Sequence, residues 1–463
     1  MRALRVIVAG GGIGGLAAAI ALQRGGHDVE VWERAADIGE VGSGLTLWPN
    51  GLRALDAIGV GAEVRSRAMA DTEGGIRDRS GRWLTRTDTG KLADRYGPVA
   101  AVHRADLFDI LRTALGGDRL RLGRTVTGVE IENRWSTKEP EDGERGGESA
   151  ASGRVTGRSA PPNHARDEVP AARGPESDAA GRAHGIGRGR APQTADAGSA
   201  RDAGEVEYEH PAGGHAARGV RVLHTGGVET ADLVIGADGL RSVVRTVVCP
   251  HARPPRYAGY TAWRMITAPR PELREGGQIW GSGEIFGIVP LADHRVYMFG
   301  AVNATEGEHA LDGEFAEVQR RFGAWPDPVP RLLAAVSPES VMRHDIYDLP
   351  DLPTFVRGRV ALLGDAAHAM TPNMGQGANL AVEDAATLAA LLGDRGVDDA
   401  LRAYDALRRP RTRALAHRSR RIGTVAQMSW PPAVRARDTA LRLMPGWAML
   451  RAFDRALDWN PPR

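Results

Sequence analysis

One carboxylate in this sequence stands where it could bind a ligand. Asp365 follows residues 360–363, a short apolar run that predicts a buried strand. At the end of such a strand, a carboxylate can accept hydrogen bonds from the hydroxyl groups of a sugar or a polyol. We therefore take Asp365 as the first candidate binding residue.

The turn that follows is rich in residues that let a backbone approach a flat ring. Pro372, Gly375 and Gly377 are rigid or lack a side chain. The helix that we expect to begin near Gln376 or Ala378 would point free N–H groups at a developing negative charge. On this stretch alone, the alternative is an ordinary strand, loop and helix whose glycines only turn the chain.

This stretch resembles the GD motif of the class A, single-component flavin-dependent monooxygenases, which are aromatic hydroxylases. The matching residues are Gly364, Asp365, Ala366, Ala367, His368, Pro372, Gly375, Gln376, Gly377 and Asn379. The resemblance implies that Asp365 holds the ribityl chain of FAD and that the backbone after Pro372 contacts the flavin. The cofactor-binding residues expected here are Gly364, Asp365, Pro372, Gly375, Gly377, Ala378 and Asn379. His368 could be a base, but its place inside the motif implies a structural role.

The N-terminal residues contain a dinucleotide-binding pattern in its required context. A strand over residues 6–9 precedes the glycines, a helix over residues 16–24 follows them, and a second strand ends at Glu33. Gly12 would let a pyrophosphate reach the backbone, and Glu33 would accept from ribose hydroxyls. The cofactor-binding residues expected here are Gly10, Gly12, Ile13, Gly14, Gly15, Glu33 and Arg34.

Three further residues are assigned to the cofactor. Gly44, beside Ser43, would let the chain run along a ring, although a turn before a helix explains it as well. Arg104 stands in an HRADL context in which the family uses an arginine for the FAD pyrophosphate and ribityl region, and a guanidinium suits such oxygens. Val126 lies in an alternating run that predicts a strand. The resemblance also implies that Trp48 and Asn50 lie near the active site.

A second strand and glycine turn resembles the DG motif of the same family. Asp238, Gly239, Ser242 and Arg245 stand at the matching positions, and the family uses this motif for FAD and NAD(P)H. Asp238 and Gly239 are therefore expected to bind cofactor. There is no second GxGxxG pattern, so no separate nicotinamide domain is expected.

Residues 256–301 contain alternating aromatic segments that predict an antiparallel sheet with one covered face. Most of these side chains should be core. The resemblance makes Arg264, Trp280, Phe286 and Tyr297 candidates for lining a substrate pocket. Arg264, Tyr297 and Pro372 are the candidate pocket residues nearest the chemistry, and no general base is assigned.

The predicted fold is α/β, with a Rossmann-like FAD-binding domain of the GR2 flavoprotein type, an antiparallel-sheet substrate domain and C-terminal helices. FAD-binding segments are expected at residues 1–75, 101–132, 219–250 and 346–395. Substrate-domain strands are expected at 76–100, the substrate-binding β-sheet domain at 251–345, and C-terminal helices at 396–463, broken by Pro410. These helices carry many arginines, and packing on the FAD domain is favoured over membrane contact. Residues 133–218 are a low-complexity insertion with few large apolar residues, for which we expect disorder. Lengthening a surface hairpin costs little, about 0.6 kcal/mol per doubling.

The composition excludes several classes of protein. A chain of 463 residues with 42% hydrophobic residues can bury two domain cores. A net charge of +2 gives no field for nucleic acid or anionic membrane. The single cysteine, Cys249, excludes a disulfide framework and the CxxC pair of flavin disulfide reductases, and we expect it to be structural. We expect no metal site, no signal peptide or membrane span, a cytoplasmic location, and a monomer or homodimer.

The resemblance implies a monooxygenase that uses FAD, NADH or NADPH, and O₂ to hydroxylate an aromatic or other electron-rich small molecule through a flavin hydroperoxide. The sequence segments LWPNGLRAL and RHDI are similar to those of the salicylate-hydroxylase and urate-hydroxylase branch of the family. A halogenase of this fold is disfavoured, because its WxWxIP run is missing and neither Lys91 nor Lys138 is a plausible catalytic lysine. A flavin oxidase, reductase or epoxidase of the same fold stays an alternative, as does a flavin-binding interaction protein.

Overall fold

A computed structural model of the chain describes residues 2–37, 43–70, 74–87, 89–131, 219–273 and 275–462. The expectations for Lys138 and for the insertion at 133–218 lie outside these residues. All described residues belong to one packed unit.

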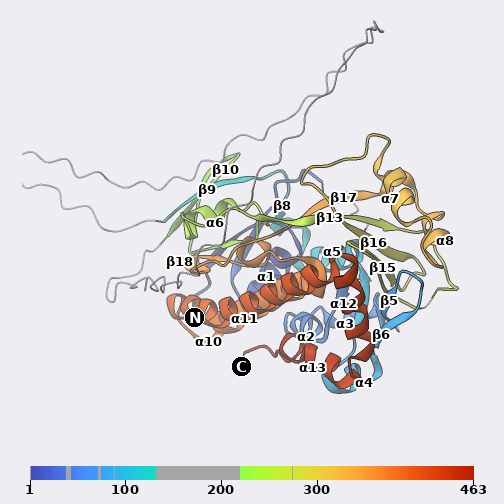
Figure 1. Ribbon diagram of the computed structural model, residues 1–463. Helices are drawn as coiled ribbons and strands as arrows, with labels where there is room; N and C mark the ends of the chain where they lie inside the picture. Colours follow the sequence, from blue (N-terminus) through green and yellow to red (C-terminus); the bar gives the residue numbers. More distant parts are fainter. Residues whose placement is uncertain are drawn as a thin grey trace, which may run out of the picture. The chain divides into compact units, whose positions relative to one another are not determined.

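The first sheet is the parallel core of a dinucleotide-binding fold (Figure 1). Its strand order is β18, β19, β12, β1, β2, β8, and every neighbouring pair is parallel except β18 with β19. The strands are β1 (Arg5–Ala9), β2 (Asp28–Trp32), β8 (Leu120–Arg121), β12 (Leu233–Gly236), β18 (Val356–Arg357) and β19 (Val360–Leu362). Because β1, β12 and β19 are parallel neighbours, the three turns that follow them lie at one edge of the sheet, where open α/β sheets bind ligands.

Helices cover this sheet and carry most of its apolar core. The buried residues of α1 pack with the Val and Ile side chains of β1, β2 and β12. The helices are α1 (Ile13–Arg24), α2 (Pro49–Ala57), α3 (Gly61–Ser66), α5 (Arg104–Leu115), α6 (Val243–Val248), α9 (Asp365–His368) and α10 (Gly377–Asp394). Helix α2 begins at Pro49, whose fixed φ suits the first helical position.

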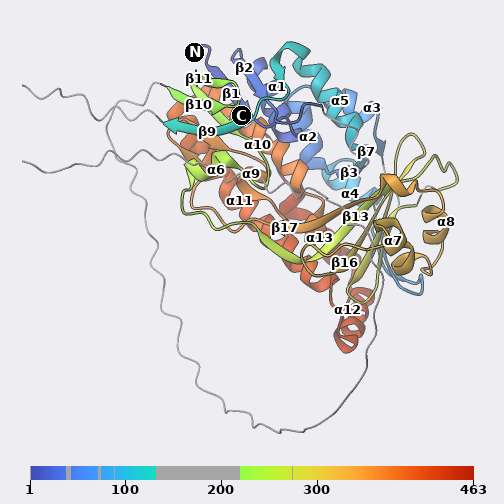
Figure 2. The same ribbon diagram turned by 90° about the horizontal axis from the view of Figure 1, so that it is seen from above.

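The second sheet has the strand order β17, β13, β16, β15, β14, β5, β6. Its strands are β5 (Gly74–Asp78), β6 (Trp83–Thr87), β13 (Arg256–Ile266), β14 (Gly277–Trp280), β15 (Glu284–Pro290), β16 (Val296–Asn303) and β17 (Met342–Asp348). The predicted antiparallel sheet is confirmed, except that β5 joins β14 in parallel. One face packs against α7 (Glu314–Phe322) and α8 (Val329–Leu333), which lie beside β13 and β16 in Figure 2.

Two small sheets complete the described strands. In the first, β7 (Ala100–His103) lies between β3 (Gly44–Leu47) and β4 (Met69–Ala70). In the second, β10 (Val220–His224) lies between β9 (Val126–Ile131) and β11 (Gly227–Ala231). The two strands that flank the insertion are therefore antiparallel neighbours, with Val220 opposite Ile131.

The structure corrects two sequence expectations about helices. Residues 89–96, expected within substrate-domain strands, form helix α4 (Thr89–Tyr96). Helix α11 (Val397–Ala426) continues through Pro410, which was expected to break it. A proline in the interior of a helix costs about 3 kcal/mol, and ion pairs of Arg408 and Arg411 with α10, on both sides of the proline, offset that cost.

The chain ends with α12 (Pro431–Leu443) and α13 (Gly446–Leu457). The remaining short elements are the 3₁₀ turns η1 (Gly117–Arg119), η2 (Pro338–Ser340) and η3 (Pro372–Met374). Among the described helices, none is long and apolar enough to cross a membrane.

Candidate active site

The glycines between β1 and α1 have distinct roles. Gly10 has φ +105°, and a Cβ there would lie 2.3 Å from the carbonyl oxygen of Ala237. A Cβ on Gly15 would lie 2.0 Å from the Gly10 oxygen, so this glycine lets α1 pack closely. A Cβ on Gly12, the N-cap of α1, would meet no protein atom within 4 Å. The loop therefore leaves open space at the helix N-terminus, where an anion is favoured.

Glu33 fixes this loop to the end of β2. Its carboxylate accepts hydrogen bonds from the backbone N–H groups of Gly11, at 2.7 Å, and Ala35, at 2.9 Å. Arg34 is exposed beside it, and the backbone of Arg124, two residues before Val126, donates to the Glu33 carbonyl. The structure thus brings Glu33, Arg34 and Val126 to one edge, but none of them lines the cavity described below.

Asp238, expected to bind cofactor, caps α6 with its carboxylate. It accepts hydrogen bonds from the Ser242 hydroxyl and from the backbone N–H groups of Val243 and Val244. Burial raises the pKa of this carboxyl, against the hydrogen bonds that lower it. Arg245 donates to the Ala366 carbonyl at 3.0 Å. The DG segment thus acts mainly as a brace, and its neighbour Gly239 lines the cavity.

The GD turn brings several predicted residues together. Gly364 has φ +58°, which favours glycine, and Asp365 begins α9 with its side chain exposed to the cavity. Gly375 also has positive φ, and α10 begins at Gly377, where a Cβ would meet no atom within 4 Å. The first N–H groups of α10 lack helical partners and face the same cavity.

Asn379 lines no part of the cavity with its side chain. Its amide accepts from the Trp48 backbone at 3.0 Å and donates to the carbonyls of Thr46 and Gly375. This fully buried side chain joins β3 to the GD turn. The cofactor binding predicted for Asn379 is therefore assigned to the backbone at the start of α10.

All of these turns open into one cavity of about 460 Å³ between the parallel sheet, the second sheet and α11. The predicted residues that line it are Gly12, Ile13, Gly14, Gly15, Gly44, Arg104, Gly239, Arg264, Trp280, Tyr297, Gly364, Asp365, Pro372, Gly375, Gly377 and Ala378. The predictions for Arg264, Tyr297 and Pro372 as pocket residues agree with this lining.

Two arginines give the cavity wall positive charge. Neither Arg104, which begins α5, nor Arg264 on β13 pairs with a carboxylate among the described residues. Desolvation lowers the pKa of Arg104, and the charge of Arg264 lowers it further. Arg264 donates to the Tyr297 hydroxyl at 3.1 Å. Tyr297 also lies against Gly44, where a Cβ would come within 2.8 Å of it.

Phe286 was expected to line the pocket, and this prediction is wrong. Successive side chains of a strand point to opposite faces. On β15, Ile285 and Val289 face the cavity, whereas Phe286 packs against Phe322 of α7 at a ring distance of 5.1 Å. The alternation of the sequence predicts that Ile285 and Phe286 lie on opposite faces of the sheet, but it does not predict which face lines the cavity.

Sequence reasoning missed several side chains that line the cavity. Tyr260 accepts a hydrogen bond from Asn373 at 3.0 Å, and burial raises its pKa to about 12. Gln278 accepts from the indole N–H of Trp280 at 2.8 Å. Tyr260 shares strand parity with Arg264, so the alternation could have identified it. Gln278 could have been found in the same way from Trp280.

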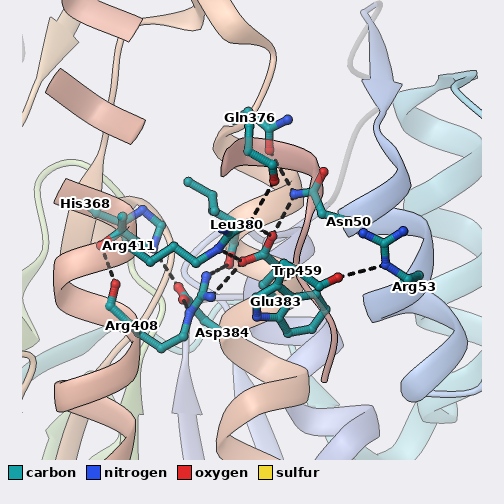
Figure 3. Close-up of polar contacts among 12 residues, drawn as sticks. Asn50, Arg53, His368, Gln376, Leu380, Glu383, Asp384, Arg408, Arg411 and Trp459 are labelled. Atoms are coloured by element: carbon teal, nitrogen blue, oxygen red, sulfur yellow. Dashed lines mark hydrogen bonds and ion pairs between the residues drawn. The ribbon is translucent and has the colours of Figure 1, made fainter. Parts of the chain in front are cut away.

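A buried ion network lies behind the first turns of α10 (Figure 3). Arg408 of α11 binds Glu383 and Asp384, each at 2.6 Å, and Arg411 binds Glu383 at 2.7 Å. His368 also contacts Asp384, at 2.6 Å. Burial alone would raise the pKa of Asp384, but the charges of His368 and Arg408 outweigh it and lower the pKa. His368 lines no part of the cavity, in keeping with the structural role expected.

This network also connects the active-site loops to the chain's last residues. Asn50 donates to Gln376 at 2.9 Å and to Glu383 at 2.7 Å. Arg53 donates to the carbonyl of Trp459 at 2.7 Å, and Arg411 donates to that of Ala456. Asn50 therefore supports the GD turn from behind.

Cys249 is buried, and burial raises the pKa of its thiol. Its sulfur donates to the Thr354 carbonyl at 3.2 Å. A protonated, buried thiol is a poor nucleophile, which agrees with the structural role expected.

The cavity fits a dinucleotide with a sugar chain and a flat ring. Ser43 lines the cavity, and its buried hydroxyl has no hydrogen-bond partner among the described residues, so a ligand there would meet an unsatisfied polar group. Gly12 and Gly377 leave open the space that a Cβ would fill. Arg104 offers a cation to a pyrophosphate and Asp365 an acceptor to ribityl hydroxyls. These features fit FAD.

Comparisons with known proteins agree with this geometry. Residues 351–419 match a family described as an FAD binding domain, and residues 8–53 match an NAD(P)-binding Rossmann-like domain. The chain is 30% identical to the aurachin C monooxygenase/isomerase of Stigmatella aurantiaca, over 95% of this chain and 94% of that protein. It is also 30% identical to the FAD-dependent urate hydroxylase of Klebsiella pneumoniae, over 90% and 89%. The crystal structure of Klebsiella pneumoniae HpxO complexed with FAD and uric acid is 27% identical, with a TM-score of 0.75 over 98% of this chain and 96% of that one.

Proposed function

This chain belongs to the class A flavin-dependent monooxygenases, and on that premise we propose that it hydroxylates an aromatic small molecule. The balanced reaction joins substrate, O₂, NAD(P)H and one proton, and gives hydroxylated substrate, water and NAD(P)⁺. The observation that carries the proposal is the single cavity into which all three nucleotide and flavin turns open, with a floor of aromatic and apolar side chains.

Different residues along the cavity would bind different parts of FAD. Gly12 and the start of α1 would receive the pyrophosphate of FAD together with Arg104, and Asp365 would bind the ribityl chain. The backbone from Gly375 into α10 would face the flavin ring. When bound, FAD supplies the electron transfer and the activation of oxygen.

The protein's part in the reaction is orientation and exclusion of water. Arg264, held by Tyr297, would bind an oxygen or anionic group of the substrate. The Tyr260 hydroxyl, fixed by Asn373, offers a second polar contact. Its high pKa keeps it protonated at neutral pH, so it donates a hydrogen bond rather than acting as a base. The apolar walls between these groups keep water from the reacting ring.

The test is NAD(P)H consumption by the FAD-loaded protein with phenolic acids, purines and quinolines, with peroxide and product measured together. A compound that both accelerates consumption and gains one oxygen atom is the expected result. Reduction that yields only peroxide with every compound would point to an oxidase. Failure to bind FAD would refute the proposal at its premise.

A further inference from the structure

The floor of the cavity becomes lower along the second sheet. On β16, Tyr297, Phe299 and Ala301 face the cavity in that order. On β13, Arg264 pairs with Phe299 and Ala262 pairs with Ala301. Tyr297 and Phe299 therefore line the end near β3, two alanines lie side by side beyond Phe299, and Tyr260 of β13 follows the alanines.

The two alanines form the base of a largely apolar recess, and Tyr260 belongs to the same cluster. Ala262 and Ala301 are buried in one cluster with Trp280, Ile285 and Ala426. Ile422 and Ala426 of α11 line the cavity opposite the sheet. The recess has methyl groups on two facing walls, so both its size and its chemistry suit an apolar group.

Arg437 of α12 holds the end of this recess in place. Its guanidinium donates to the carbonyls of Ala426 and Gly281, each at 2.9 Å, and lies 5.4 Å from the Trp280 ring. The side chain is itself buried. Because this clamp fixes both walls, the recess cannot simply close, and an unfilled hollow would forgo the dispersion contacts of a packed interior.

The floor is longer than one aromatic ring. Tyr297 and Ala301 are four residues apart on a strand, which corresponds to about 14 Å. Arg264 and Tyr297 hold polar groups at one end of the floor, Tyr260 lies at the other end, and the alanines lie between them. A single-ring substrate bound at Arg264 would leave the alanines uncovered.

We propose that the recess selects substrates whose reacting ring system carries a further apolar part, an alkyl chain. That part would lie on Ala262 and Ala301 and against Ala426. The inference rests on the proposed function, because the reacting ring is the one that the monooxygenase would hydroxylate.

The experiment compares matched ligands on FAD-loaded protein, with the visible spectrum of the flavin as the binding signal. The probes are 4-hydroxyquinoline and its 2-methyl, 2-butyl and 2-heptyl derivatives. Affinity should rise along the series by about 4-fold for each methylene that the recess buries. The rise should stop when the recess is full.

Two variants fill the recess from opposite walls. Ala301→Leu and Ala426→Leu should each weaken binding of the heptyl compound at least ~10-fold, while 4-hydroxyquinoline binds within about 3-fold of wild type. Ala292→Leu is the control, because Ala292 is exposed in the turn between β15 and β16 and does not line the cavity. It should leave the whole series unchanged. Circular dichroism checks that each variant folds, and either filling variant alone is sufficient for the test.

Equal weakening of all compounds by both filling variants would overturn the inference, as would affinity that does not increase with chain length. Failure of every quinoline to bind while salicylate binds would overturn it too, and would leave the monooxygenase proposal intact. A protein that binds FAD but hydroxylates none of the compounds that it binds would instead contradict the proposed function.

Discussion

Replacing Arg408 by methionine should destabilise the protein more than any surface charge change. Arg408, Glu383 and Asp384 have side-chain exposures of 1%, 0% and 0%. The guanidinium lies 2.6 Å from an oxygen of each carboxylate. Methionine has a similar length but no charge, so the variant leaves two buried carboxylates with one cation fewer.

The remaining contacts set the size of the effect. Glu383 keeps Arg411, at 2.7 Å, and Asn50, at 2.7 Å. Asp384 keeps His368 and the backbone N–H of Gly364, at 2.9 Å. Breaking a buried ion pair on one side costs about 3–5 kcal/mol, and because both carboxylates retain partners we expect the lower end, about 3 kcal/mol.

Urea unfolding of the FAD-free protein, followed by far-UV circular dichroism, measures this difference. Arg402→Met is the matched control on the same helix, because Arg402 is 58% exposed and its one ion pair among the described residues is with the exposed Asp399. Its loss should stay below about 1 kcal/mol. If Arg408→Met lost no more than this control, the buried network would not be the support for α10 that the structure indicates.

The same variant should respond differently to acid. The lowered pKa of Asp384 stabilises the wild type above the carboxyl's unfolded pKa, and this contribution is lost as pH falls through the folded value. Without Arg408, the folded pKa of Asp384 should rise. The variant should therefore begin to lose stability at a higher pH than the wild type, as unfolding curves between pH 3 and pH 7 would show. Parallel curves would contradict this.

Three further predictions concern the cavity. Gly12→Val should fold normally but lower the affinity for FAD at least ~100-fold, because its side chain enters the open space at the start of α1. Gly15→Val should fail to fold stably, because its Cβ would lie 2.0 Å from a carbonyl oxygen. Flavin titration and thermal unfolding distinguish the two variants, and equal behaviour would refute the distinction. Arg104→Gln should weaken FAD binding about 10–100-fold in the same titration, through loss of a charged contact worth about 1.5–3 kcal/mol, and unchanged affinity would remove Arg104 from the site. Phe286→Leu should lower stability by about 1 kcal/mol and leave KM unchanged, whereas Phe299→Leu should raise KM with little loss of stability; the reverse result would mean that the two faces of the sheet are misassigned.

The predictions from the sequence were most accurate for segments whose structure depends on the local backbone alone. The turns at Gly10 and Gly364 need positive φ, and the position of Gly15 has no room for a Cβ. Because only glycine meets these requirements, the residue type itself indicates the local structure. The parallel strands before these turns are continuous apolar runs with short connections. Each strand, turn and helix could therefore be predicted from its own motif. The parallel pairing of β1, β12 and β19 brings the turns together.

Side-chain roles were harder to predict because they depend on contacts between distant segments. Asp238 and Asn379 stand in the expected motifs, yet their side chains bind backbone groups of α6 and β3. The network of Glu383 with Arg408 and Arg411 joins two helices whose pairing the sequence did not reveal. A polar residue in a motif can thus serve the fold while its backbone serves the ligand.

Helix α10 links stability to cofactor binding through this division of roles. Its first turn, from Gly377, lines the cavity, and Glu383 and Asp384 lie two turns later in the buried network. A ligand that binds only the folded state adds stability in proportion to the logarithm of its concentration over its dissociation constant, about 4 kcal/mol at 1,000-fold excess. FAD should therefore restore much of what Arg408→Met removes, unless the variant also displaces the first turn of α10. Incomplete rescue by saturating FAD would show that the ion network positions the cavity wall as well as holding the two helices together.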